Sequence, residues 1–132
     1  MNKTEAIFQT TAPYNNYYQD IENYKRLLFV CSAGLLRSAT GSNLYSQKGY
    51  NTRACGTHEY ALVPLSANLI QWADKIIFVN KENYVTALST FAGTELDEPL
   101  RNKSKVLDIP DQYSFMDPHL VKFYQEQLGE DV

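Results

Sequence analysis

The chain has 132 residues, 44% of them hydrophobic and 20% charged, which is enough apolar material for one packed domain and argues against wholesale disorder. Its formal net charge is -3 and it has no basic stripe, so a nucleic-acid partner is not expected. No apolar run approaches a membrane span, no secretory signal is recognisable, and two cysteines are too few for a disulfide framework. We therefore expect a cytoplasmic protein with reduced thiols.

The first 24 residues are rich in tyrosine, with Tyr14, Tyr17, Tyr18 and Tyr24 close together. We expect residues 1–24 to form an extension that packs on the domain as an amphipathic helix. An aromatic flap beside a binding site and an unattached tail are the alternatives. Residues 25–132 are expected to form the domain itself.

Strand and helix patterns alternate from residue 26 onward. Apolar or β-prone runs predict strands at residues 26–31, 50–55, 75–80 and 103–109. Short connections between alternating strands and helices predict an α/β fold, a single three-layer domain in which helices flank a four-stranded parallel sheet.

Helices are expected between these strands and after the last one, at residues 38–49, 66–74, 81–90 and 117–128. Their predicted N-caps are Ser38 or Thr40, then Ser66, and finally Asp117 before Pro118. Residues 92–103, which contain Gly93 and Pro99, are expected to be loop.

The segment around Cys31 carries the most chemical information. Cys31 ends a buried strand, a short loop follows, and Arg37 opens a helix. Loop N–H groups and a helix N-terminus can surround a tetrahedral anion, and a guanidinium can hold two of its oxygens. The same field favours the thiolate form of Cys31, which would be a nucleophile toward a bound phosphoryl group. The expected phosphate-binding residues are Ser32, Ala33, Gly34, Leu35, Leu36 and Arg37.

The pattern Cys-x5-Arg-Ser between the first strand and the first helix resembles the low-molecular-weight protein tyrosine phosphatases. Residues 52–57, 72–79 and 107–118 support the resemblance, which spans roughly residues 25–128. It implies a phosphate-binding loop after the first strand and phosphotyrosine hydrolysis through a phosphocysteine. It also implies that the Ser38 hydroxyl donates to the sulfur.

This chain departs from that family at the loop supports. Gly34 and Ala54 stand where the family often has a supporting asparagine and serine, and Leu36 stands where it often has a second cysteine. The rigidity of the loop is therefore an open point, and the protective disulfide of the family is not expected.

The resemblance also implies an acidic residue on the loop after the fourth strand, where it would protonate the leaving oxygen. Asp111 is the preferred candidate, Asp108 is the competitor, and Asp117 is better explained as a helix cap. Tyr113 either forms a wall of an aromatic cleft or is a buried structural residue. No metal or other cofactor is needed, because the loop and Arg37 supply the electrophilic stabilisation.

Three other activities fit parts of the pattern. The loop Cys31-Ser32-Ala33-Gly34 resembles the phosphocarrier B components of cellobiose-type sugar transport, which lack the arginine found here at Arg37. Arsenate reduction would need two further cysteines, and Cys55 is the only other thiol. A phosphate-binding module without turnover is the third possibility. A phosphatase acting on a phosphotyrosine protein or a small phosphomonoester is the preferred prediction.

Overall fold

The computed structural model describes residues 24–132, so the predictions for the tyrosine-rich extension lie outside it except at Tyr24. The described chain contains one parallel sheet of four strands in the order β2-β1-β3-β4. The strands are β1 (Arg26–Cys31), β2 (Asn51–Gly56), β3 (Lys75–Phe78) and β4 (Ser104–Val106). The predicted α/β class and parallel sheet are confirmed.

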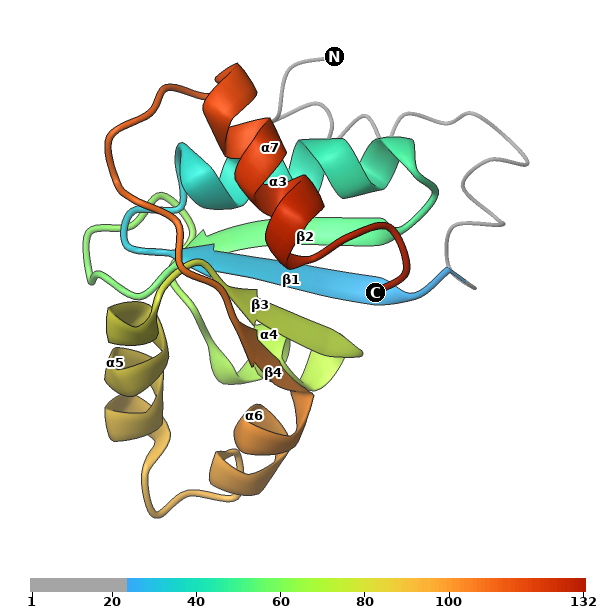
Figure 1. Cartoon of the computed structure of the whole chain (residues 1–132). Coiled ribbons are helices and arrows are strands. Elements are labelled where there is room, and N and C mark those ends of the chain that lie inside the picture. The colour runs from blue at the N-terminus through green and yellow to red at the C-terminus, as the bar shows by residue number, and fades with distance from the viewer. Residues whose placement is uncertain (1–23) are drawn as a thin grey trace.

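Helices cover both faces of the sheet (Figure 1). One face carries α3 (Arg37–Gln47) and α7 (Pro118–Gln127). The other carries α4 (Ala67–Trp72), α5 (Lys81–Phe91) and α6 (Asp97–Lys103). Three layers result, as predicted.

Strand β1 is apolar throughout because both of its faces are buried. Leu27 and Phe29 pack toward α3 and α7, whereas Leu28 and Val30 pack toward α4, α5 and α6. All of these side chains are 0% exposed. This explains why the strand reads as a continuous apolar run rather than an alternating one, and it fixes the carboxyl end of β1 in the middle of the sheet.

The prediction of loop for residues 92–103 is wrong, because α6 occupies Asp97–Lys103. Pro99 lies in the first turn of that helix, where backbone N–H groups have no intrahelical partner and proline costs little. Strand β4 is shorter than predicted, although the N–H groups of Leu107 and Ile109 still bond to carbonyls at the end of β3.

Two of the predicted helix caps are confirmed and the third is wrong. The Ser66 hydroxyl accepts from the third residue of its helix at 3.3 Å, and Asp117 accepts from a first-turn N–H at 2.8 Å. Helix α3 begins at Arg37 without a side-chain cap. The Ser38 hydroxyl instead faces the Cys31 sulfur, and the Thr40 hydroxyl donates to a loop carbonyl.

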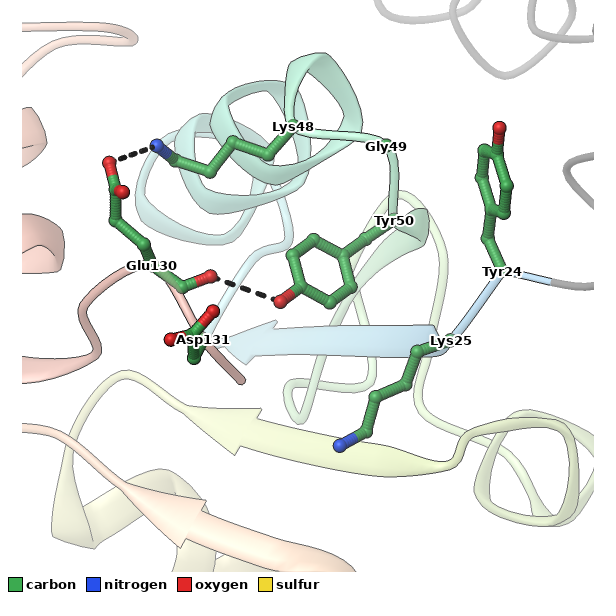
Figure 2. Close-up of a pocket in the computed structure, with 7 residues that line it drawn as sticks. All are labelled: Tyr24, Lys25, Lys48, Gly49, Tyr50, Glu130 and Asp131. Carbon is green, nitrogen blue, oxygen red and sulfur yellow. Dashed lines mark hydrogen bonds and ion pairs between the residues drawn. The ribbon is translucent and has the colours of Figure 1, made fainter.

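The amino ends of β1 and β2 lie at the end of the sheet opposite to Cys31. A cavity of about 340 Å³ is present there, lined by Tyr24, Lys25, Lys48, Gly49, Tyr50, Glu130 and Asp131 (Figure 2). Several of its polar groups pair with one another: Lys48 contacts the Glu130 carboxylate at 3.2 Å, and the Tyr50 hydroxyl donates to the Glu130 carbonyl at 3.0 Å. The C-terminal segment is thereby held at this end of the sheet.

Within residues 24–132, no helix combines the length and apolar character needed to cross a bilayer.

Candidate active site

Cys31 lies at the carboxyl end of β1 and is 3% exposed. Its sulfur is 3.1 Å from the backbone nitrogen of Gly34 and 3.1 Å from the Ser38 hydroxyl oxygen. A backbone N–H and a hydroxyl therefore converge on one sulfur atom. The Gly34 N–H donates to the sulfur, and the Ser38 hydroxyl lies within hydrogen-bond distance of it.

The loop after Cys31 is held from outside by the segment that follows β2. Its first carbonyls accept backbone bonds of 2.9–3.2 Å from that segment: Thr57 to Cys31, His58 to Ser32 and Leu62 to Ala33. The carbonyls of the first loop residues are thereby paired with the neighbouring segment, whereas the Gly34 N–H faces the Cys31 sulfur.

Two glycines allow the loop to lie this close to β2. Gly34 has φ of +76°, and a Cβ there would meet the carbonyl carbon of Cys55 at 3.0 Å. A Cβ on Gly56 would lie 2.3 Å from the Ser32 carbonyl oxygen. A side chain at either position would displace the loop, so close packing against β2 gives both glycines a steric reason.

Arg37 opens α3 and is also 3% exposed. Its guanidinium donates to the Ile109 carbonyl at 3.0 Å and lies 3.6 Å from the Asp111 carboxylate, measured from Nε. The Tyr124 hydroxyl donates to the Arg37 backbone carbonyl at 2.6 Å. Burial, and then the neighbouring Cys31 charge, raise the pKa of Tyr124 well above its ordinary value, so this hydroxyl stays a donor.

The acid candidates occupy different positions. Asp111 is 69% exposed and is the aspartate that the structure brings to Arg37. Asp108 is exposed, and both its backbone N–H and its carbonyl are bonded by Gln127 of α7 at 2.6 and 2.9 Å. Asp117 caps α7. Of the three aspartates, Asp111 is therefore the one whose carboxylate lies beside the Arg37 guanidinium.

Tyr113 lies in the loop that connects β4 to α7. Its ring stacks on His119 at 5.2 Å between centroids and with 13° between planes, so one of its faces is covered. His58 is exposed. No three His, Cys, Asp or Glu side chains among residues 24–132 are grouped as a metal site would require.

Cys31 and Cys55 belong to different core clusters on opposite faces of the sheet. A disulfide between them would need one strand to turn over, so Cys55 is not placed to pair with Cys31.

No known protein-family model matches the chain, and no curated protein sequence matches it. Solved structures with a similar fold do exist. The YwlE arginine phosphatase from Geobacillus stearothermophilus superposes with a TM-score of 0.59 at 17% identity, covering 77% of this chain and 84% of that chain. The predicted resemblance is therefore confirmed at the level of the fold.

Two Wzb proteins superpose in the same way. Vibrio vulnificus Wzb, solved in complex with benzylphosphonate, gives a TM-score of 0.56 at 17% identity, with 77% and 90% of the two chains covered. The tyrosine phosphatase Wzb from Escherichia coli K30, solved in complex with phosphate, gives 0.56 at 15% identity, with 77% and 89% covered. At these identities the similarity establishes the architecture and not the chemistry.

Several contacts at the site have no counterpart in the sequence predictions. These are the Ile109 carbonyl on Arg37, the Tyr124 hydroxyl behind it, and a bond between the Ser32 hydroxyl and Asn83. The first is a backbone atom, which no residue pattern reveals. For the Ser32–Asn83 bond, the signal in the sequence is the pair of asparagines at positions 80 and 83, where the predicted third strand gives way to a helix.

Proposed function

We propose that the chain is a cysteine-dependent phosphatase that hydrolyses phosphotyrosine or another phosphomonoester. The observation that carries the proposal is the convergence of Gly34 N and Ser38 Oγ on the Cys31 sulfur. Arg37, whose side chain is buried, is the first residue of the helix that follows the loop. The fold shared with YwlE and Wzb supports it.

In the proposed reaction the Cys31 thiolate attacks phosphorus and the bond to the leaving oxygen breaks. Arg37 and the loop N–H groups hold the phosphoryl oxygens as their charge changes. Asp111 gives its proton to the leaving oxygen, since an aryl or alkyl oxide is a poor leaving group at neutral pH. The product of this step is a phosphocysteine.

In the second step water attacks the phosphocysteine and the sulfur leaves as a thiolate. Asp111, now a carboxylate, takes a proton from the water, and the Ser38 hydroxyl donates to the departing sulfur. Inorganic phosphate is released and both groups return to their starting states. The chain's own residues supply every proton transfer.

Steady-state hydrolysis of p-nitrophenyl phosphate without added metal tests the proposal. We expect Cys31→Ser and Arg37→Ala to abolish turnover, and Asp111→Asn to lower kcat by about a hundredfold. Asp108→Asn is the matched carboxylate control, and we expect it to stay near wild type. Wild-type activity in Cys31→Ser would refute the proposed nucleophile.

The substrate class is tested with phosphotyrosine peptide beside phosphoarginine, since the structural neighbours include an arginine phosphatase and a tyrosine phosphatase. We expect faster release of phosphate from the phosphotyrosine peptide. Faster release from phosphoarginine would overturn the choice of a monoester, and a stable phosphoprotein without release would favour a carrier.

A further inference from the structure

One side-chain amide joins the candidate phosphate-binding loop to a helix of the opposite layer. Asn83 lies in the first turn of α5 and is 3% exposed. Its Oδ1 is 3.2 Å from the hydroxyl oxygen of Ser32, the first loop residue after Cys31. The same Oδ1 is 2.9 Å from the hydroxyl oxygen of Thr57, which follows β2.

The hydrogen bonds fix the orientation of this amide. Asn83 Nδ2 donates to Asn80 Oδ1 at 2.8 Å, and Asn80 Oδ1 also accepts the Asn83 backbone N–H at 2.9 Å. A group that accepts a backbone N–H must be the carbonyl oxygen of Asn80, so the Asn83 NH₂ group faces it. Asn83 Oδ1 therefore faces the hydroxyls of Ser32 and Thr57, and both hydroxyls must donate to it.

This orientation assigns a role to the Ser32 side chain. Its proton is committed to Asn83 and is not available to a phosphate oxygen. The Ser32 hydroxyl is thus a tether to α5, and only its backbone N–H remains for the anion. Thr57 is tethered by the same oxygen, and its own N–H holds the Cys31 carbonyl at 2.9 Å.

The tether matters because two side-chain supports that the family resemblance implies for the loop are missing here. Gly34 and Ala54 carry no polar side chain. The family that the sequence resembles often has a supporting asparagine and serine at these two positions. The backbone bonds that hold the loop come from the segment after β2, which is largely exposed at positions 58–60. Asn83 connects both segments to α5, a helix capped by Asn80 and packed on the core.

We propose that Asn83 is a positioning residue, which sets the shape of the phosphate-binding loop through the hydroxyls of Ser32 and Thr57. The proposal deepens the phosphatase assignment and rests on it for its kinetic consequences. Asn83→Ala removes the shared acceptor and releases both hydroxyls. We expect phosphate affinity and kcat/KM to fall about tenfold or more, since small displacements of binding groups are costly.

The experiment measures the binding of inorganic phosphate by calorimetry and, separately, the hydrolysis of p-nitrophenyl phosphate. Thr86→Ala is the matched control. Thr86 lies on the same helix and lines the same cavity of about 420 Å³ as Ser32, Thr57 and Asn83, but takes no part in the hydroxyl bonds. We expect Thr86→Ala to remain within about twofold of wild type in both measurements.

A double-mutant cycle separates positioning from general destabilisation. If Asn83 acts through Ser32, the fold-loss of phosphate affinity in the Asn83→Ala, Ser32→Ala double variant will be much smaller than the product of the two single fold-losses. A double variant whose fold-loss equals that product would overturn the proposal. A folded Asn83→Ala variant with wild-type phosphate affinity would overturn it too. Should Asn83→Ala fail to fold, Ser32→Ala and Thr57→Val each remove one donor, and unchanged phosphate affinity in both would also overturn it.

Phosphate binding and turnover keep this proposal distinct from the proposed function. A wild-type protein that binds phosphate without hydrolysing the ester would refute the phosphatase assignment. The ratio of phosphate affinities between wild type and Asn83→Ala would still test the tether.

Discussion

Replacing Gly56 by alanine should shift the loop that follows Cys31, the proposed phosphate-binding loop, without removing any group from it. The added Cβ would lie 2.3 Å from the Ser32 carbonyl oxygen and 2.8 Å from the Ala33 carbonyl carbon, both backbone atoms. Ordinary contact begins at 3.4 Å, so the loop must retreat by about 1 Å. A misplacement of that size can cost about a hundredfold in rate, and we expect kcat/KM for p-nitrophenyl phosphate to fall by about that factor.

Gly93→Ala is the control for a glycine that does not touch the loop. Its Cβ would meet nothing within 4 Å, while its φ of +77° still penalises a side chain. We expect Gly93→Ala to lower stability by about 1–2 kcal/mol and to leave kcat/KM within about twofold. Thermal melts beside the kinetics separate the two effects. A folded Gly56→Ala enzyme with wild-type kcat/KM would refute the argument that close approach to β2 shapes the loop.

Two further predictions concern the layer formed by α3 and α7. Gly41→Ala would place a Cβ 2.5 Å from a buried phenylalanine ring, and overpacking should exceed the gain in helix propensity, for a net loss of about 1–2 kcal/mol in denaturant unfolding. Burial raises the pKa of Tyr45 from 10.0 to about 12, so the folded state keeps this proton longer than the unfolded chain. The contribution of this proton to the free energy of unfolding is fully present below pH 10 and is lost as the pH rises toward 12. The free energy of unfolding of Tyr45→Phe should therefore fall less steeply with alkaline pH than that of wild type.

The sequence was most informative where one segment carries both the structure and the chemistry. A buried strand ending at Cys31, a short loop and a helix opening at Arg37 are local features, and their geometry follows from chain connectivity. The parallel sheet and the three layers follow from the alternation of strands and helices. These are the parts of the fold that the structure confirms.

The predictions failed where the tertiary environment decides what a residue does. Ser38 and Thr40 have good N-cap side chains, yet the loop that precedes α3 uses their hydroxyls for the sulfur and for a carbonyl. Pro99 favours a loop when the sequence alone is considered, although the first turn of a helix tolerates proline. Asn83 lies 51 residues from Ser32, and no local pattern links the two positions.

The placement of the two cysteines on opposite sheet faces has a consequence for how this protein meets oxidants. A sulfenic acid formed on Cys31 would find no neighbouring thiol in the sheet to trap it as a reducible disulfide. Continued exposure to peroxide would carry the sulfur on to acids that ordinary thiol reductants do not reverse. Prolonged oxidation of Cys31 would therefore be irreversible to thiol reductants, because no disulfide within the sheet can intercept the sulfenic acid.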